Sequence, residues 1–282
     1  METFKVSVLV PIYRTRPEFL REAIRSVLAQ TFRDFELLLL DDCPEDDREF
    51  VICEFDDPRI VYRKNERNLG IAMTRNRLID LSKGEYLAVF DHDDVCRPDR
   101  LEKEVAYLDT HPSCGVVGGR IKPSNGTMVV YPENDDAIRL GMISGCCVWH
   151  PAAMIRKEVL LRTGVRYEAA YSPCEDYKLW FSLMSQTEFH NLPDVLIDYR
   201  WHENNTSVVH KDRLVLADMR CKAWARVNLP ELYAEYELCK ETITRVKVLG
   251  LPLFKIITTR RYTDVLLFGT VKVLSLYRKF SS

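Results

Sequence analysis

Three carboxylates stand within four residues directly after an apolar run. The run Leu87–Phe90 leads into Asp91-His92-Asp93-Asp94. Apolar residues without polar alternation are typical of a strand buried on both faces of a parallel sheet, and open α/β sheets bind ligands at the carboxyl ends of their strands. Carboxylates there could hold Mn²⁺ or Mg²⁺, which in turn could clamp a diphosphate. The alternative is a solvated acidic turn before a helix that Pro98 opens.

Polar residues also follow two earlier predicted strands. Pro11 and Tyr13 come after the strand predicted over 5–10, and Asp41 comes after the one over 35–40. A carboxylate at the end of the second strand can accept a hydrogen bond from an N–H of a bound base or from a ribose hydroxyl. Asp41 as a helix cap is the structural alternative.

Arg75 lies early in a helix predicted over 71–81. There its guanidinium and the helix dipole could both meet a phosphate, although a solvated surface arginine is the alternative. Taken together, Asp41, Arg75 and the carboxylates after Phe90 indicate a nucleotide-diphosphate and metal site.

Strands and helices alternate through the first part of the chain. Strands are predicted over 5–10, 35–40, 59–63, 87–90 and 115–119, with helices over 17–28, 71–81 and 98–111. Alternation of this kind predicts an α/β fold with a doubly wound, mostly parallel sheet and right-handed crossovers. The strand ends named above then meet at one edge of the sheet.

The pattern changes after Arg120. A hairpin is predicted over 121–132, around Ser124-Asn125-Gly126, and the chain reads as helical from Leu214 to Val248. We therefore expect a domain over 1–205, divided near residue 119, and a helical C-terminal extension over 206–282.

Bulk composition narrows the class of protein. The chain has 282 residues, 46% of them hydrophobic, and a net charge of −2, so no overall field favours nucleic acid. Its nine cysteines include no Cys-x-x-Cys pair. This argues against a disulfide framework or a zinc site and favours a reducing compartment. No apolar stretch reaches the length of a membrane span.

A series of motifs runs from about residue 5 to about 207: Val8-Leu9-Val10-Pro11-Ile12-Tyr13, Ser26-Val27-Leu28-Ala29-Gln30-Thr31-Phe32, Leu40-Asp41-Asp42, Asn68-Leu69-Gly70, Arg75-Asn76, Gly84-Glu85-Tyr86 and Phe90-Asp91-His92-Asp93-Asp94. In these motifs the sequence resembles glycosyltransferase family 2, of the GT-A fold.

The resemblance implies a role for each residue of a donor site. It implies that Asp41 contacts the uracil of a UDP-sugar between Pro11 and Tyr13, that Arg75 approaches the diphosphate, that Asp91 touches the ribose or the sugar, and that Asp93 binds the metal.

Glu175-Asp176 matches a Glu-Asp pair that opens a helix in the family. The second carboxylate is the implied general base, which removes the acceptor proton as the glycosidic bond forms. A carboxylate favoured by the helix dipole is the alternative for Asp176. Glu175, Asp94 and Trp149 are expected beside these groups or toward the acceptor.

Tyr199-Arg200-Trp201-His202 resembles the family's Tyr-Arg-x-His segment, a loop that closes over the diphosphate. The resemblance implies that Arg200 helps to bind the donor and that His202 approaches the metal. Two departures stand out. Cys43-Pro44 replaces the Gly-Ser of many relatives, and Ile197 occupies the glutamine position of the Gln-x-x-Arg-Trp motif in processive relatives. A processive polymerase is therefore not expected.

The implied activity is inverting transfer of one sugar from a UDP-sugar to an oligosaccharide or lipid-linked glycan acceptor, with Mn²⁺ or Mg²⁺, in bacterial lipopolysaccharide or capsule synthesis. The alternatives are a sugar-phosphate nucleotidylyltransferase and a catalytically degenerate sugar-binding relative. The first should open with a glycine-rich loop, which the segment after Val10 lacks, and the acids Asp93 and Asp176 argue against the second.

The C-terminal tail bears on location. Residues 255–282 interleave six lysines and arginines with apolar residues and carry a single acid, Asp264. A basic amphipathic helix there could lie on an anionic membrane, whereas packing on the core or at a homodimer interface is the alternative. We expect a cytoplasmic protein, with this tail as the candidate contact to the inner face of the membrane.

Overall fold

The computed structural model describes residues 3–46, 48–203, 205–209, 211–239, 242–248, 251–258, 262–267 and 271–277. The chain divides into two compact units, Met1–Trp224 and Ala225–Ser282. This division places helix α8 (Thr206–Val209) and most of helix α9 (Lys211–Asn228) with the first unit. The predicted catalytic boundary near residue 205 and the division near residue 119 remain predictions.

The first unit is built on an eight-stranded sheet in the order β3-β2-β1-β4-β7-β6-β8-β5. Its strands are β1 (Phe4–Ile12), β2 (Phe35–Asp41), β3 (Ile60–Lys64), β4 (Gly84–Val89), β5 (Val95–Cys96), β6 (Cys114–Pro123), β7 (Met154–Arg156) and β8 (Glu188–Tyr199). Neighbours are parallel from β3 to β4 and between β6 and β8, whereas β7 and β5 run antiparallel to their neighbours. The predicted α/β fold with a mostly parallel sheet is confirmed.

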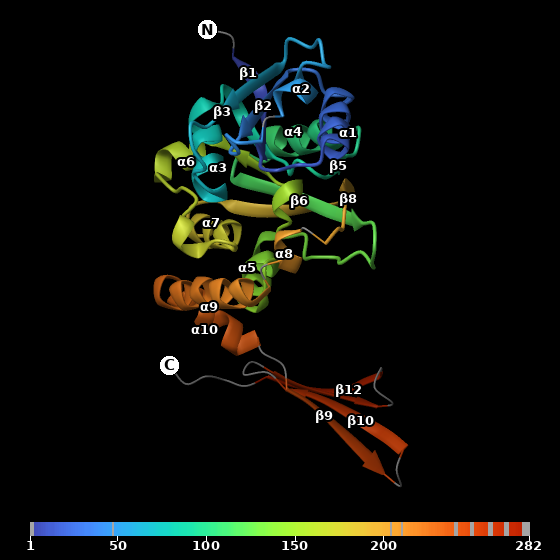
Figure 1. Ribbon diagram of the computed structural model, residues 1–282. Coiled ribbons are helices and arrows are strands. Elements are labelled where there is room, and N and C mark those ends of the chain that lie inside the picture. Colours follow the sequence, from blue (N-terminus) through green and yellow to red (C-terminus); the bar gives the residue numbers. More distant parts are fainter. Residues whose placement is uncertain are drawn as a thin grey trace. The chain divides into compact units, whose positions relative to one another are not determined.

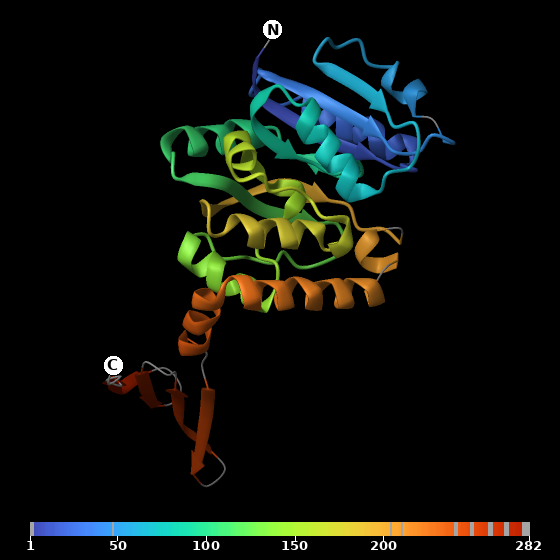
Figure 2. The same cartoon turned by 90° about the vertical axis from the view of Figure 1, so that its left-hand side faces the viewer.

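Helices cover both faces of this sheet (Figures 1 and 2). They are α1 (Pro17–Leu28), α2 (Glu49–Ile52), α3 (Ile71–Leu81), α4 (Arg100–Thr110), α5 (Asp135–Ser144), α6 (Lys157–Thr163) and α7 (Glu175–Leu183), with 3₁₀ turns at His150–Ala152 and Ala169–Tyr171.

Alternation along β1 explains the double winding, since successive side chains of a strand point to opposite faces. Val8 lies in the main core with Leu20 and Ile24 of α1. Leu9 points the other way and lines a small pocket with Arg75 of α3. Helix α3 therefore covers the face opposite to α1, and its polar side chains reach the carboxyl ends of the strands.

The hairpin predicted over 121–132 is wrong. Strand β6 continues to Pro123 because it pairs in parallel with β8, and residues 124–134 contain no strand. The Ser124 N–H donates to the Tyr199 carbonyl at the end of β8. The backbone groups of 121–123 that a local hairpin would have paired are thus paired with β8.

Helices continue into α8 (Thr206–Val209), α9 (Lys211–Asn228) and α10 (Pro230–Cys239), as expected. Beyond them the prediction is wrong, because a four-stranded antiparallel sheet follows: β9 (Thr242–Val248), β10 (Leu251–Thr258), β11 (Tyr262–Leu267) and β12 (Val271–Tyr277). The basic amphipathic helix predicted over 255–282 is replaced by strands wherever that tail is described.

The physical reason lies in side-chain periodicity. Thr242–Val248 is rich in β-branched residues, and its apolar and polar residues nearly alternate, whereas in Val271–Tyr277 the alternation breaks after Val271-Lys272-Val273. Period-two alternation in short runs favours strands, whereas a helix requires spacings of three and four. Within the described residues, no helix is sufficiently long and apolar to cross a membrane.

Candidate functional site

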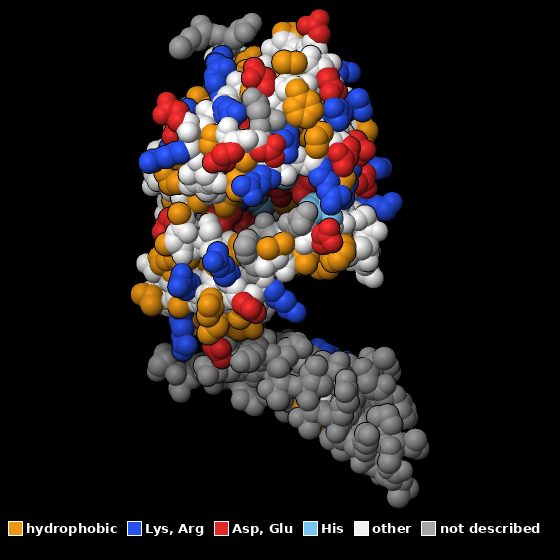
Figure 3. Space-filling model, in the orientation of Figure 1, with side chains coloured by type: hydrophobic (Ala, Val, Ile, Leu, Met, Phe, Trp, Pro, Cys, Tyr) orange, Lys and Arg blue, Asp and Glu red, His pale blue; other side chains and the backbone are white. Residues whose placement is uncertain are grey.

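Acidic, basic and histidine side chains meet in a hollow across the middle of the first unit (Figure 3). The parallel register aligns Ile12 of β1 with Asp41 of β2, and β4, on the other side of β1, ends at Val89 opposite Leu9. Pro11 is buried at this edge, whereas Tyr13 is exposed just after it. The strand ends therefore meet at one edge, as the sequence predicts.

Asp41 is completely buried at the end of β2. One carboxylate oxygen accepts from the Cys43 N–H at 2.9 Å, and the other accepts from the Tyr62 hydroxyl at 3.1 Å. Burial raises the pKa of the Asp41 carboxyl, and these two hydrogen bonds oppose the shift. A carboxylate has about four acceptor positions, so Asp41 retains the capacity to accept from a bound base.

Asp42 organises the neighbouring turn, a role the sequence interpretation missed. Its carboxylate accepts from Asn65 Nδ2 at 2.7 Å and from the Leu69 and Gly70 N–H groups at 2.8 Å each. Gly70 precedes α3 with φ of 79°, a conformation that favours glycine. Asp42 thereby fixes the start of the helix that carries Arg75.

Arg75 joins three elements of the site. Nη1 donates to Glu175 Oε1 of α7 at 2.6 Å, and Nη2 lies 3.4 Å from Asp91 Oδ1, just after β4. The guanidinium lies over the Tyr167 ring, 5.6 Å from its centroid. Only 11% of the Arg75 side chain is exposed. The structure thus brings together three predicted site residues that are far apart in the sequence.

The carboxylates around Arg75 are electrostatically perturbed. Burial raises the pKa of the Asp91 carboxyl, and Arg75 opposes the rise. Burial also raises the pKa of Asp176 to about 6; Glu175 adds to this shift, while Arg75 and the Tyr177 N–H oppose it. At neutral pH Asp176 is therefore mostly ionised and able to accept a proton.

Asp93 and His202 meet although 109 positions separate them: Asp93 Oδ2 lies 2.9 Å from His202 Nε2. Asp94 is buried, and its Oδ1 accepts from the Arg200 N–H at 2.8 Å. Asp94 therefore anchors the segment after β8 that carries His202. Burial, reinforced by Asp91 and Asp93, raises the pKa of Asp94 well above its usual range.

Two predicted residues lie apart from Arg75. The Arg200 guanidinium pairs with Glu22 and lies over the Phe19 ring of α1, 4.1 Å from its centroid. Trp149 packs against Tyr131, with ring centroids 5.0 Å apart. Its buried Nε1 has no hydrogen-bond partner in the described part of the chain. The structure does not bring either side chain to the Arg75 cluster.

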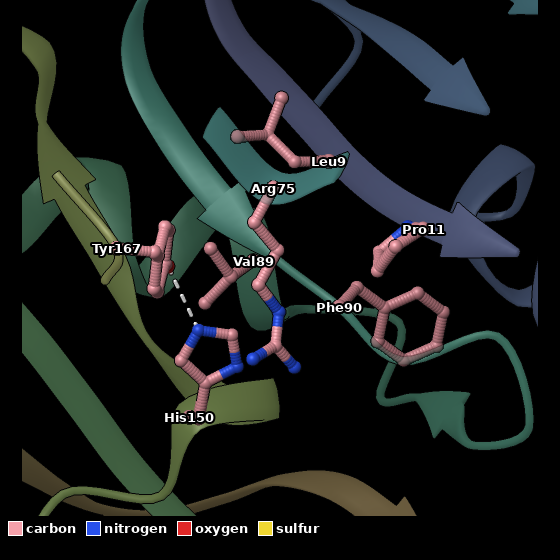
Figure 4. A pocket seen from close by; sticks show the side chains of 7 residues that line it. All are labelled: Leu9, Pro11, Arg75, Val89, Phe90, His150 and Tyr167. Atoms are coloured by element: carbon pink, nitrogen blue, oxygen red, sulfur yellow. Dashed lines mark hydrogen bonds between the residues drawn. The ribbon is translucent and has the colours of Figure 1, made fainter. Parts of the chain in front are cut away.

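His150 and Tyr167 are site residues that the sequence interpretation missed. Both line the small pocket around Arg75, and His150 Nε2 lies 2.8 Å from the Tyr167 hydroxyl (Figure 4). Burial and Arg75 lower the pKa of His150 well below its usual range, so it is neutral. The sequence offered only the tripeptide Trp149-His150-Pro151, which has no periodic pattern.

Arg100 supports the acidic loop from behind. It is completely buried, pairs with Glu104 at 3.0 Å, and donates to the carbonyls of Val89 at 2.9 Å and Ala153 at 3.2 Å. Burial raises the pKa of Glu104 to about 7, and Arg100 opposes the shift. The ion pair thus fixes the backbone one residue before Phe90 and the carboxylates that follow.

Comparisons with known proteins identify the family. Residues 7–163 match the family model described as Glycosyl transferase family 2. The chain belongs to this family. It is 34% identical over 207 residues to an uncharacterized glycosyltransferase of Haemophilus influenzae, covering 68% of this chain and 74% of that protein. A Bacillus subtilis relative, TuaG, named for teichuronic acid biosynthesis, is 28% identical over 214 residues, covering 72% of this chain and 81% of TuaG.

Solved structures support the GT-A fold of this glycosyltransferase. Staphylococcus aureus TarS 1–349 in complex with UDP-GlcNAc matches with a TM-score of 0.62 at 21% identity, over 71% of this chain and 60% of that one. A mannosyltransferase from Pyrobaculum calidifontis, in complex with GDP-Man and Mn²⁺, matches with a TM-score of 0.57 at 15% identity, over 83% and 76%. The match to the UDP-GlcNAc complex of TarS thus spans less than two thirds of that chain.

Proposed function

We propose that this glycosyltransferase moves a single sugar from a UDP-sugar to a glycan acceptor with inversion, assisted by a divalent cation. The observation that carries the proposal is the cluster in which Arg75 contacts both Asp91 and Glu175, beside Asp176. It sets a cation for a diphosphate next to a carboxylate that is ionised at neutral pH.

The donor nucleotide is assigned to the edge formed by β1 and β2. Buried Asp41 offers carboxylate oxygens to the N–H of uracil, between Pro11 and the exposed ring of Tyr13. Arg75 presents a planar fork suited to phosphate oxygens, and it lies in α3, which begins directly after Gly70 and whose N-terminus favours negative charge.

The residues at the acidic loop fit a divalent cation. Asp93 supplies a carboxylate oxygen and His202 an imidazole nitrogen within 2.9 Å of each other, a donor set that Mn²⁺ accepts. No group of three or more His, Cys, Asp or Glu able to hold a metal occurs among the described residues. Two protein ligands, with phosphate oxygens and water completing the sphere, match how such ions bind in nucleotide sites. When bound, the ion would stabilise the departing diphosphate.

Asp176 is assigned as the general base. Its pKa of about 6 keeps it ionised at neutral pH and close to the value at which proton acceptance is efficient. Glu175, the residue before it, forms an ion pair with Arg75. The general base is therefore next in the chain to the residue that pairs with the donor-binding guanidinium. Transfer in surface polysaccharide synthesis is supported by the name of the relative TuaG.

The test is a panel of UDP, GDP, UDP-sugars and GDP-mannose, each with and without MnCl₂, scored by calorimetry and by release of nucleoside diphosphate. We expect UDP and one or more UDP-sugars to bind, with affinity raised by Mn²⁺ in the wild type but not in Asp93→Asn. Asp80→Asn, an exposed acid on α3, is the matched control and should behave as the wild type. Preference for GDP, or binding that ignores both metal and Asp93, would refute the proposal.

A further inference from the structure

Three side chains at the start of α1 contact the segment that follows β8. They are Arg16, directly before the helix, and Phe19 and Glu22 within it. Because they stand three positions apart, they lie along one side of the helix. We call these three residues the α1 strip. Each of them contacts a residue in the segment 200–203, which carries His202.

Phe19 is the central residue of the α1 strip. The centroid of its half-buried ring lies 5.5 Å from that of the His202 ring, with 31° between the two planes. The Cζ atom of Arg200 lies 4.1 Å from the Phe19 centroid, and that of Arg16 lies 5.4 Å from it. Contacts of a ring with cations and with a second ring are attractive at these distances. One ring thus contacts two guanidinium groups and the imidazole that faces Asp93.

Two ion pairs accompany these ring contacts. The Arg200 guanidinium pairs with Glu22, and Arg16 Nη2 lies 3.8 Å from Glu203 Oε1. Pairs that are exposed to solvent contribute little to stability individually. Their polarity carries information, however, because the α1 strip offers an acid to Arg200 and a base to Glu203. The reverse direction would place like charges together, so the segment fits the α1 strip in one orientation.

The main chain of the segment is held by different groups. The Arg200 N–H donates to Asp94 Oδ1 at 2.8 Å, and the His202 N–H donates to Asn205 Oδ1. These hydrogen bonds fix the backbone but do not set the rotation of the His202 imidazole. The imidazole itself meets the Asp93 carboxylate on one side and the Phe19 ring on another.

We propose that the α1 strip positions His202 for the divalent cation, and that Phe19 sets the orientation of its imidazole. The inference rests on the proposed function, in which Asp93 and His202 hold that cation. Loss of a group that orients a ligating histidine typically costs about ten- to hundredfold in metal affinity. A ring contact is weaker than the hydrogen bonds that usually serve this purpose, so we expect about three- to tenfold for Phe19.

The test is Mn²⁺ binding to the full chain, with and without UDP, measured from the paramagnetic resonance signal of free Mn²⁺. Phe19→Leu removes the ring but keeps an apolar side chain that a helix accepts, and it should raise the Kd for Mn²⁺ about three- to tenfold. Phe19→Tyr keeps the ring and should bind Mn²⁺ as the wild type does.

Phe55→Leu is the matched control. Phe55 is also half-buried, and its ring centroid lies 6.0 Å from the Cζ atom of an α1 arginine, Arg25. Its loss should lower Tm, as the loss of Phe19 should, but leave the Kd for Mn²⁺ unchanged. A purely structural role of Phe19 would give this same pattern, so the comparison separates positioning from stability.

Two further measurements ask whether Phe19 acts through His202. In a His202→Ala background, Phe19→Leu should have no additional effect on the Kd for Mn²⁺. In the metal-free chain, the Arg200 amide should exchange its hydrogen faster in Phe19→Leu than in the wild type or Phe55→Leu, because the segment opens more often.

The outcomes separate this inference from the proposed function. A Kd that Phe19→Leu leaves unchanged, while Asp93→Asn raises it, would overturn the positioning role and leave the metal site in place. A loss that persists in the His202→Ala background would also overturn it, because Phe19 would then act through another group. Mn²⁺ binding that ignores both Asp93→Asn and His202→Ala would refute the metal site itself, and the inference with it.

Discussion

Asp176→Asn should remove the general base while leaving the volume and the hydrogen bond from the Tyr177 N–H almost unchanged. Loss of a general base costs about 10²–10⁴ in rate, so turnover should fall by that order. Donor affinity should change little, because the base acts on the acceptor. For the wild type, log kcat/KM should rise with pH up to about 6 and then level, since only the ionised carboxylate of the free enzyme accepts a proton.

The same substitution should stabilise the fold, and the magnitude follows from the pKa. The pKa of Asp176 rises from 3.8 to about 6, because burial disfavours the charged carboxylate. A group whose pKa is higher in the folded state lowers stability above that pKa, and the effect vanishes below the unfolded value. A shift of about two units corresponds to at most about 3 kcal/mol at pH 8, or roughly 5–10 °C in Tm.

The assay is thermal melting at pH 4 and pH 8 beside calorimetry with the donor and steady-state transfer. Asp136→Asn provides the control, because Asp136 is an exposed acid in the first turn of α5, where its negative charge interacts favourably with the helix dipole. It should lower stability by about 0.3–1 kcal/mol. Asp176→Asn should instead raise stability at pH 8 and leave it unchanged at pH 4. Retained turnover, or a loss of stability like that of the control, would refute the assignment and leave Asp176 as a helix-capping carboxylate.

Three further outcomes are expected. Asp93→Ala, or excess chelator with the wild type, should abolish transfer with a small change in Tm; full activity in chelator would exclude the metal site. Arg75→Lys keeps the charge but loses the planar fork, so the donor Kd by calorimetry should rise at least tenfold; an unchanged Kd would remove Arg75 from the donor site. Arg100→Met should cost about 3–5 kcal/mol in urea unfolding at pH 8, because Glu104 is left buried without its partner and the Val89 and Ala153 carbonyls lose their donor; a loss below 1 kcal/mol would mean that Arg100 does not hold the loop.

Much of the nucleotide half could be predicted because its signals are local. The apolar runs within Phe35–Asp41 and Gly84–Val89 predicted buried strands. Pro17 and Gly70 marked the positions at which two helices begin. The second half depends on pairing between distant segments. Strand β6 extends to Pro123 only because β8 lies beside it, and no local pattern encodes that partner. Over 242–277, the short apolar runs fit both the two-residue period of a strand and the longer period of a helix. The helical prediction there was wrong.

Predictability within the site follows the same division. Asp41, Asp91 and Asp93 could be found because they end strands. Arg75 could be predicted as a cation at a helix start, but its partner Glu175 lies 100 positions away. Arg100 and His150 gave no signal, since a basic residue in a helix and a histidine beside a proline are usually surface residues. Their roles depend on burial, which only the folded chain determines.

The contacts of Arg75 link donor binding to the state of the base. Glu175 and Asp176 are consecutive, and Arg75 holds the first while opposing the raised pKa of the second. If the guanidinium turns toward a diphosphate, the Glu175 carboxylate loses its buried partner and both carboxylates face less positive charge. The pKa of Asp176 should then be higher in the donor complex than in the free enzyme, because a neighbouring anion disfavours ionisation. The kcat and kcat/KM profiles of the wild type report these two states separately, so their midpoints measure how far Arg75 moves from Glu175 when the donor binds.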